Sequence, residues 1–213
     1  MINLLRIIFY GIFVKFIVKI LLGLNIKHLE NFPTHGPAVI VANHNSHLDT
    51  MIIMSLIPFG QLLKTYPVAS MDYFMKNKLL SWFSLNIIGI IPIRRCIKKS
   101  TEHPLKKVYQ ALSNDAILIY FPEGSRGLPE ELSTFKSGIA RISQKYPSMP
   151  IVPIALNGGG KVLPKGKLLF VPLTCQVVVG ESIYWKGEKD IFMQKLEHSV
   201  IKLINEGDFI QWE

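Results

Sequence analysis

Cysteine is scarce in this chain of 213 residues, which contains only Cys96 and Cys175. Neither belongs to a Cys-x-x-Cys pair, which argues against a disulfide framework and against a cysteine-ligated zinc site. We interpret both as free thiols that pack in the interior, because isolated cysteines behave as small apolar residues. The fold must therefore be stabilised by a hydrophobic core, which a single domain of this length can bury.

Charged residues are also few, at 18% of the chain against 49% hydrophobic residues, and acidic residues are the scarcer kind. The 15 Asp and Glu residues are outnumbered by 24 Lys and Arg residues, so the formal net charge is +9. A basic surface attracts nucleic acid, anionic lipid or a phosphorylated small molecule. Nucleic acid is the least favoured of the three, because no motif of the known nucleic-acid-binding modules occurs.

The first 24 residues are strongly apolar, but Arg6, Lys15 and Lys19 interrupt them, and no cleavage site of a signal peptide follows. Lys15 and Lys19 lie one helical turn apart and share a face. This pattern favours a helix that lies in the membrane interface with its lysines toward the headgroups. A single membrane span and an ordinary core helix are the alternatives. We assign residues 1–30 to this membrane-associating helix and residues 31–213 to one domain.

Short β-branched runs alternate with helical patterns along the rest of the chain. We predict strands at 38–42, 87–93, 116–121, 151–156 and 175–179, helices at 50–56, 67–85, 105–112, 135–146 and 190–204, and an irregular link at 25–37. This alternation predicts an α/β fold in which helices flank a mostly parallel central sheet. Such sheets bind ligands at the carboxyl ends of their strands.

The run from Asn43 to Asp49, with the sequence NHNSHLD, directly follows the predicted strand at 38–42. The imidazole of His44 can accept a proton from an alcohol, and a carboxylate on its other ring nitrogen would fix the tautomer. No Gly-x-Ser-x-Gly motif occurs, so we expect His44 to activate a substrate hydroxyl directly, without a covalent intermediate. The structural alternative is a helix cap formed by Ser46 and Asp49. A metal site is disfavoured because no further His or Cys cluster supports it.

A second polar motif, FPEGSR at 121–126, follows the predicted strand at 116–121. Gly124 allows close approach of a ligand to the backbone, and the planar guanidinium of Arg126 suits a phosphate. A surface turn with a salt bridge is the alternative. Arg94 and Arg95, with Lys98 and Lys99, form a basic cluster after residues 87–93, which either holds a phosphate or faces solvent or lipid.

Taken in order, these motifs resemble the four sequence blocks of the glycerolipid acyltransferase family, the 1-acylglycerol-3-phosphate acyltransferases and their relatives. The blocks are matched by residues 43–49, by Gly89 with Arg95, by residues 121–126 and by Val152-Pro153-Ile154. The run 135–138, with the sequence FKSG, also matches the family. The resemblance covers residues 38–183, and four blocks in one order are far more specific than any one of them.

The resemblance implies transfer of a fatty acyl group from acyl-CoA or acyl-carrier protein to a hydroxyl of lysophosphatidate or a related lysophospholipid. The thioester is a co-substrate, and neither a cofactor nor a metal is implied. His44 would be the general base and Asp49 its partner. The substrate-binding residues would be Asn43, Ser46, Gly89, Arg94, Arg95, Glu123, Gly124, Ser125, Arg126 and Lys136.

Three departures from the family pattern leave the acceptor open. Arg94 stands where aspartate is common, Gly127 stands where serine is common, and residues 68–74 are unlike the common lysophosphatidate enzymes. A different lipid acceptor and a non-catalytic lipid-binding relative are therefore the alternatives. We expect membrane lipids and the thioester donor as partners, with no nucleic acid, and a bacterial inner membrane with a cytoplasm-facing active site as the location. The sequence does not fix an oligomeric state.

Overall fold

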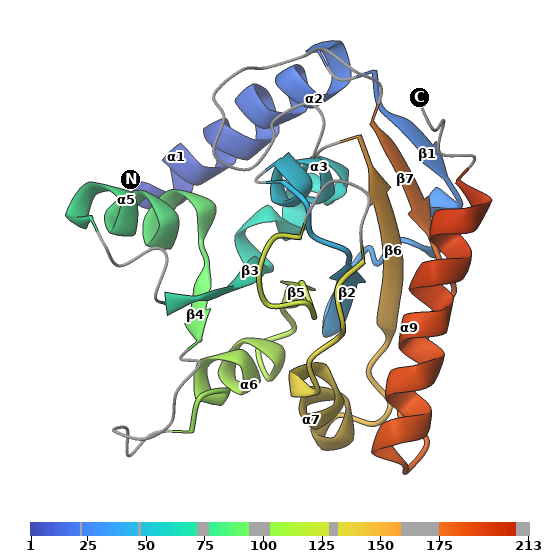
Figure 1. The fold of residues 1–213 in the computed structure, drawn as a ribbon. Coiled ribbons are helices and arrows are strands. Elements are labelled where there is room, and N and C mark those ends of the chain that lie inside the picture. Colours follow the sequence, from blue (N-terminus) through green and yellow to red (C-terminus); the bar gives the residue numbers. More distant parts are fainter. Residues whose placement is uncertain are drawn as a thin grey trace.

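The computed structural model describes residues 1–21, 23–46, 48–71, 77–93, 103–127, 132–158 and 175–207. Within these ranges, seven strands form one sheet in the order β1-β7-β6-β2-β5-β3-β4 (Figure 1). Neighbouring strands are parallel except β6 and β7, which are antiparallel. The predicted α/β fold with a mostly parallel sheet is therefore confirmed. The strands are β1 (Asn25–Lys27), β2 (Ala38–Ala42), β3 (Thr65–Ser70), β4 (Ile91–Ile93), β5 (Ile117–Tyr120), β6 (Ile151–Asn157) and β7 (Gln176–Val179).

Helices cover both faces of the sheet, and β2 shows why. All five residues of β2 are buried, as expected for a central strand of a parallel sheet. Alternate side chains point to opposite faces, so Ile40 joins one apolar cluster and Val39 and Val41 join the other. The first cluster lies under the N-terminal helix and α3 (Leu48–Leu56). The second lies under α6 (Lys106–Leu112), α7 (Gly138–Lys145) and α9 (Lys189–Glu206).

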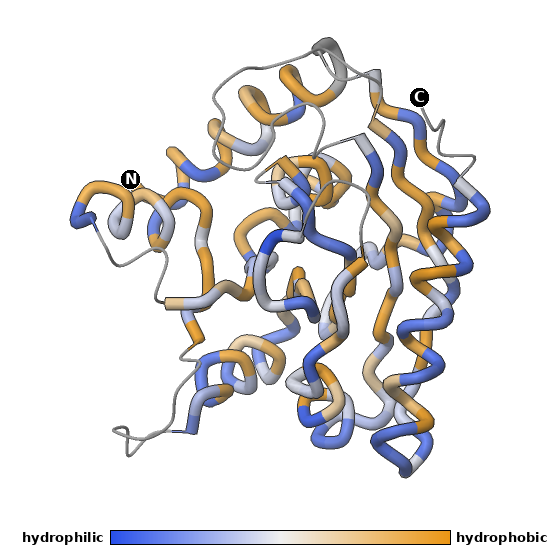
Figure 2. The backbone as a smooth tube through the Cα atoms, in the orientation of Figure 1, coloured by the Kyte–Doolittle hydropathy of each residue, from blue (hydrophilic) through white to orange (hydrophobic). Residues whose placement is uncertain are grey.

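The N-terminal helix is continuous from α1 (Ile2–Ile8) through the π-helical turns of η1 (Phe9–Val14) into α2 (Lys15–Leu21). It lies beside α5 (Lys78–Phe83) and its π-helical continuation η4 (Ser84–Ile88), and Figure 2 shows that both segments are predominantly apolar. None of the helices in the described ranges is long and apolar enough to cross a membrane. Lys15, which we expected to face lipid headgroups, instead donates to the carbonyl of Ile57 at 3.4 Å.

Three of the predicted elements differ from the structure. Residues 65–70 form β3, although the predicted helix at 67–85 includes most of them. Among the described residues, α5 and the start of η4 agree with the predicted helix, whereas residues 72–76 lie outside the described ranges. Pro67 argues against a strand at this position in the sequence, because proline is depleted in interior strands. The link at 25–37 contains β1 and the short 3₁₀ turn η2 (Leu29–Asn31), and β4 is shorter than its predicted strand because η4 extends to Ile88. A further 3₁₀ segment, η3 (Phe59–Lys64), was not predicted.

Candidate active site

The two polar motifs meet at one edge of the sheet because β2 and β5 are parallel neighbours. Each motif begins directly after its strand, so both loops emerge from the carboxyl ends of adjacent strands. The backbone N–H of His44 donates to Oε1 of Glu123 at 2.7 Å, and the N–H of Gly127 donates to the carbonyl of His44 at 2.9 Å. The 123–127 loop therefore holds both backbone polar groups of His44.

His44 and Asp49 form the pair that the sequence predicted. Nδ1 of His44 lies 3.0 Å from Oδ2 of Asp49, and their side chains are 17% and 3% exposed. The ring of His44 also stacks on Phe121, with centroids 4.0 Å apart and planes inclined by 17°. With Asp49 ionised, Nδ1 carries the ring proton, so an incoming hydroxyl would give its proton to Nε2.

Asp49 also stabilises the turn that carries His44. Its Oδ2 accepts hydrogen bonds from the backbone N–H groups of Asn45 and Ser46, each at 2.7 Å. Ser46 Oγ in turn accepts from the backbone N–H of Leu48 at 3.2 Å, at the start of α3. These hydrogen bonds agree with the helix-cap interpretation, which is compatible with the catalytic one. The same carboxylate oxygen caps the helix and orients the imidazole.

Glu123 is buried at 2% exposure and bridges two loops. Its second oxygen, Oε2, accepts from the backbone N–H of Ser133 at 3.0 Å, while Oε1 holds His44. Burial raises the pKa of Glu123, and the hydrogen bonds from the His44 and Ser133 backbones oppose that rise. Both oxygens of this predicted substrate-binding residue thus contact the protein's own backbone.

Asn43 extends the sheet beyond the end of β2. Its Nδ2 donates to the carbonyl of Leu156 at 2.8 Å, and the N–H of Leu156 donates to Oδ1 at 2.7 Å. The side-chain amide thereby replaces one backbone unit in the pairing of β2 with β6, and Asn43 is 4% exposed. These contacts fix the direction in which the chain leaves the strand toward His44.

Gly124 occupies the left-handed region with φ of 72°, where glycine is favoured. A Cβ at this position would lie 2.8 Å from Nζ of Lys136, so the loop and this lysine are in close contact. The backbone N–H of Lys136 donates to the carbonyl of Pro122 at 2.9 Å. Ser125 is exposed and Arg126 half-buried on the same loop. The loop thus carries one cationic residue, Arg126, and its Gly124 lies against a second, Lys136.

The second predicted block is only partly described. Gly89 has φ of 75° and lies against the guanidinium of Arg6, a residue that we did not predict to be buried. Arg94 and Arg95 lie outside the described residues, as do His47, Cys96, Lys98 and Lys99. Cys175 is a buried free thiol, and burial together with the nearby charge of Asp49 raises its pKa to about 12.

Sequence reasoning missed the residues that act through their backbone. Gly127 and Ser133 hold His44 and Glu123 through N–H groups, which carry no side-chain signature. Phe121 was quoted only as part of a motif, although its ring stacks on the imidazole. Its position directly after a strand, two residues before Glu123, was the one signal that could have indicated this role.

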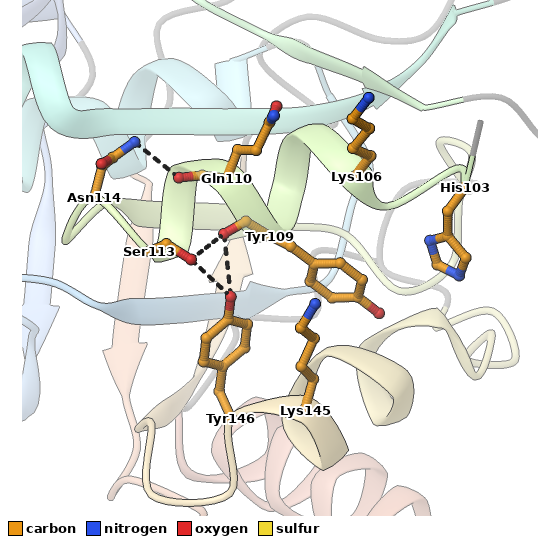
Figure 3. A pocket seen from close by; sticks show the side chains of 8 residues that line it. All are labelled: His103, Lys106, Tyr109, Gln110, Ser113, Asn114, Lys145 and Tyr146. Atoms are coloured by element: carbon orange, nitrogen blue, oxygen red, sulfur yellow. Dashed lines mark hydrogen bonds between the residues drawn. The ribbon is translucent and has the colours of Figure 1, made fainter.

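A hollow of about 650 Å³ lies between α6 and α7, away from these residues (Figure 3). The ring of Tyr109 lies in it, with Nζ of Lys145 4.0 Å from the ring centroid. The hydroxyl of Tyr146 donates to the carbonyl of Tyr109 at 3.1 Å. Among the predicted site residues that the structure describes, none lines this hollow, so the hollow is separate from the His44 site.

The fold and the site together define a class: an α/β protein with a histidine–aspartate pair at the end of a central strand, beside a loop that carries cations. The family model Acyltransferase matches residues 23–157, well over half of the chain. The chain therefore belongs to the Acyltransferase family.

Individual relatives agree with this assignment. A chloroplastic 1-acyl-sn-glycerol-3-phosphate acyltransferase of Arabidopsis thaliana is 33% identical over 144 residues, which are 67% of this chain and 38% of the relative. The alpha form of the same enzyme from Bos taurus is 26% identical over 198 residues, which are 89% of this chain and 66% of the relative. The chain thus spans well under half the length of its chloroplastic relatives.

A solved structure shares the fold along the whole chain. The 1-acyl-sn-glycerophosphate acyltransferase PlsC from Thermotoga maritima superimposes with a TM-score of 0.72 at 20% identity. The match covers 100% of this chain and 93% of the other. At this identity the likeness concerns the fold, a single α/β domain with a central sheet flanked by helices.

Proposed function

We propose that this chain transfers a fatty acyl group from a thioester to the hydroxyl of 1-acyl-sn-glycerol-3-phosphate or a related lysophospholipid at a membrane surface. The observation that carries the proposal is the His44–Asp49 pair, held at the end of β2 by the 123–127 loop. The names of the relatives supply the acceptor class, since they are 1-acyl-sn-glycerol-3-phosphate acyltransferases.

In the proposed mechanism, Nε2 of His44 takes the proton of the acceptor hydroxyl as its oxygen attacks the thioester carbonyl. Asp49 stabilises the imidazolium that forms. The tetrahedral intermediate then collapses, the carbon–sulfur bond breaks, and the imidazolium returns the proton to the departing thiolate. The products are the ester and a free thiol, of coenzyme A or of acyl-carrier protein, so no external acid or base is consumed.

Arg126 of the 123–127 loop and the neighbouring Lys136 would bind the acceptor's phosphate. Arg126 offers a planar fork to phosphate oxygens, and Lys136 offers a compact positive charge. Gly124, which lies against Lys136, lets the backbone come close to a bound anion. The basic residues Arg94 and Arg95 of the second block are assigned to the same role by the family resemblance.

Membrane association is proposed from a surface that we call the apolar plate. It combines the outer sides of the N-terminal helix and of α5 with η4, and large exposed apolar patches mark membrane or protein contacts. Membrane-borne substrates would make lipid the natural occupant. Its exposed members are Ile2, Leu4, Leu5, Ile8, Ile12, Phe13, Phe16, Leu79, Leu80, Trp82 and Leu85. A cytoplasm-facing site on a bacterial inner membrane remains our proposal for the location.

The decisive experiment is an acyl-transfer assay of purified protein with oleoyl-CoA or an acyl-carrier-protein thioester and a panel of lysophospholipids. His44→Ala should lower kcat by about 10³-fold or more, since general-base catalysis and its orientation are lost together. His28→Ala is the matched control, because His28 also pairs with a carboxylate but lies on the exposed surface. Equal activity of wild type and His44→Ala would refute the mechanism. Lipid binding without transfer from any donor would favour the non-catalytic alternative.

A further inference from the structure

The N-terminal helix is apolar on nearly every side, so hydrophobicity alone does not define which face packs inward. Its inward face is a stripe at a spacing of four residues: Arg6, Tyr10, Val14 and Val18 are all buried. In an α-helix of 3.6 residues per turn, that spacing drifts steadily around the axis. The wider π-helical turn of η1 opposes this drift, so the stripe stays on one side.

The two polar members of this stripe contact the segment around α5 and β3. The guanidinium of Arg6, 6% exposed, donates to the carbonyl of Thr65, and its carbon lies 5.1 Å from the ring centroid of Tyr66. The hydroxyl of Tyr10 donates to the carbonyl of Ile88 at 3.1 Å, at the end of η4. We call Arg6 and Tyr10 the polar clamp.

Gly89 provides the space that the clamp needs. A Cβ at this position would lie 2.6 and 2.7 Å from the two terminal nitrogens of Arg6, closer than such contacts occur. The backbone of Gly89 also adopts φ of 75°, which disfavours any side chain. The sequence block that contains Gly89 thus depends on this glycine for a contact with the N-terminal helix.

Burial of the charged Arg6 side chain costs free energy, because the guanidinium loses its hydration. Within the described ranges no carboxylate forms an ion pair with it, and its Nε has no hydrogen-bond partner. Burial lowers its pKa, which reflects the cost of removing the charge from water. An apolar residue would pack there at lower cost, but it would not distinguish one helix face from another.

We propose that the polar clamp is a positioning device, which fixes the face of the N-terminal helix and joins it to α5 as one rigid apolar plate. The edge-to-face contact of Phe9 with Phe83, at 5.5 Å between centroids, lies in the same seam. The clamp thereby sets the orientation in which the His44 site meets lipid-borne acceptor. This inference rests on the membrane association proposed above.

The test uses Arg6→Met in the full chain with vesicles of equal parts phosphatidylethanolamine and phosphatidylglycerol. Trp82 lies on α5, and its quenching by brominated lipid reports whether α5 enters the membrane; Trp82→Phe gives the share due to this residue. In Arg6→Met, the Trp82 share of quenching should fall by about half or more, because the loss of the Arg6 contacts with Thr65 and Tyr66 loosens the seam that holds the N-terminal helix beside α5. Arg141→Met, which alters an exposed arginine of α7, is the control and should leave quenching unchanged.

Kinetics separate positioning from simple loss of fold. For acceptor in vesicles, Arg6→Met should raise KM about 10-fold, whereas kcat with detergent-dispersed acceptor should stay within about 2-fold of wild type. In the quenching assay, Gly89→Ala should act in the same direction as Arg6→Met, and the double variant should be no worse than the more severe single one, because both break one contact. Because the family resemblance assigns Gly89 to substrate binding, no unchanged kcat is expected of this variant. Tyr10→Phe, which removes only a hydroxyl, should give a smaller shift of the same kind.

The outcomes separate this inference from the proposed function. If Arg6→Met shows the same Trp82 quenching and the same KM as the wild type, the clamp is refuted. Absence of vesicle binding by the wild type would overturn the proposed membrane association and the clamp with it. A wild type that binds vesicles and shows the Arg6-dependent quenching, but transfers no acyl group, would keep the clamp and refute the proposed reaction.

Discussion

Two histidine–carboxylate pairs in the described part of this molecule show that a short distance does not by itself mark a preorganised site. His28 and Glu206 are the closer pair, with Nε2 and Oε1 2.6 Å apart, yet their side chains are 45% and 39% exposed. His44 and Asp49 are 3.0 Å apart and largely buried. A ranking by distance alone would select the exposed pair over the buried pair that we propose to be catalytic.

The difference lies in what holds the carboxylate. Asp49 is fixed by two backbone N–H groups, and its histidine is fixed by the 123–127 loop and by the ring of Phe121. Glu206 is on the last turn of a surface helix, and His28 is shared with Glu30 at 3.4 Å. Preorganisation thus distinguishes the buried pair, since an orienting carboxylate that moves cannot select one tautomer.

The largest effect in this comparison is expected for Asp49→Asn against Glu206→Gln. An amide at position 49 can keep its oxygen at the place of Oδ2, where it accepts from the two backbone N–H groups and still from Nδ1 of His44. The amide carries no negative charge, so the imidazolium that forms on proton uptake loses its stabilising partner. We expect kcat to fall about 10³-fold with the fold retained.

The measurement is steady-state acyl transfer beside a thermal melt of each variant. Glu206→Gln should keep kcat within about 2-fold of wild type, because that pair touches no reacting atom. A comparable loss of kcat in both variants would show that preorganisation does not separate the pairs.

Glu123→Gln tests the support of the buried pair. A glutamine keeps one acceptor for the N–H of His44 but presents an NH₂ to the N–H of Ser133, which leaves buried donors unpaired at a cost of about 1–3 kcal/mol. The resulting shift of the His44 backbone should lower kcat by about 10- to 100-fold. A variant with wild-type kcat would mean that Glu123 does not position His44.

The same variant carries a pH signature. Because burial raises the pKa of Glu123 in the folded protein, ionisation of this carboxyl opposes folding. The stability of wild type relative to Glu123→Gln should therefore increase as pH falls through the raised pKa, and level off below the ordinary value of 4.5. Denaturant melts of both proteins at matched pH values measure this difference, and a pH-independent difference would contradict the direction of the shift.

Sequence reasoning found the buried pair because its residues are contiguous with a strongly β-branched strand. The strand at 38–42 and the spacing of His44 and Asp49 were enough to predict a turn in which imidazole and carboxylate meet. The sequence also placed both polar motifs at the carboxyl ends of strands. It did not predict that β2 and β5 are neighbours, which is what brings Glu123 to His44. The His44–Asp49 contact could be predicted because both side chains have recognisable chemistry and lie close in sequence to a clearly predicted strand.

What the sequence could not predict depends on tertiary context. β3 contains Pro67, which local propensity scores as a break, although its neighbours β5 and β4 stabilise it as a strand. Arg6 reads as the charged start of an amphipathic helix, yet it is buried against Gly89 from a segment some 80 residues away. The contact of Gly127 with His44 uses a backbone N–H, which every residue except proline has, so the residue type gives no signal for it.

Gly124→Ala should have a smaller effect than the changes above. The φ of 72° costs a side chain about 1–2 kcal/mol, and the new Cβ would displace the flexible end of Lys136. Stability should fall by that amount and KM for a phosphorylated acceptor should rise a few-fold. Gly60→Ala is the control, because a Cβ there would meet no atom within 4 Å. Equal melting temperatures of both variants would argue against the strain at Gly124.

The smallest effect is expected from His28→Gln, which removes the exposed pair. The hydrogen bond that His28 donates to Glu206, together with the one to Glu30, raises the pKa of His28, and the same bond lowers the pKa of Glu206. The stabilisation from His28 is complete below its ordinary value of 6.5 and is lost as pH rises through the raised pKa. The stabilisation from Glu206 is complete above 4.5 and is lost as pH falls through the lowered pKa.

Both contributions are therefore present together between pH 4.5 and 6.5. In this window His28→Gln should have a slightly lower melting temperature than wild type, and the difference should be small because solvent screens an exposed pair. Above the raised pKa of His28 the two proteins should have the same melting temperature. Acyl transfer should be the same in both at every pH. A loss of activity in His28→Gln would mean that the contact of His28 with α9 influences the His44 site. Solvent exposure would then not be what separates the two pairs.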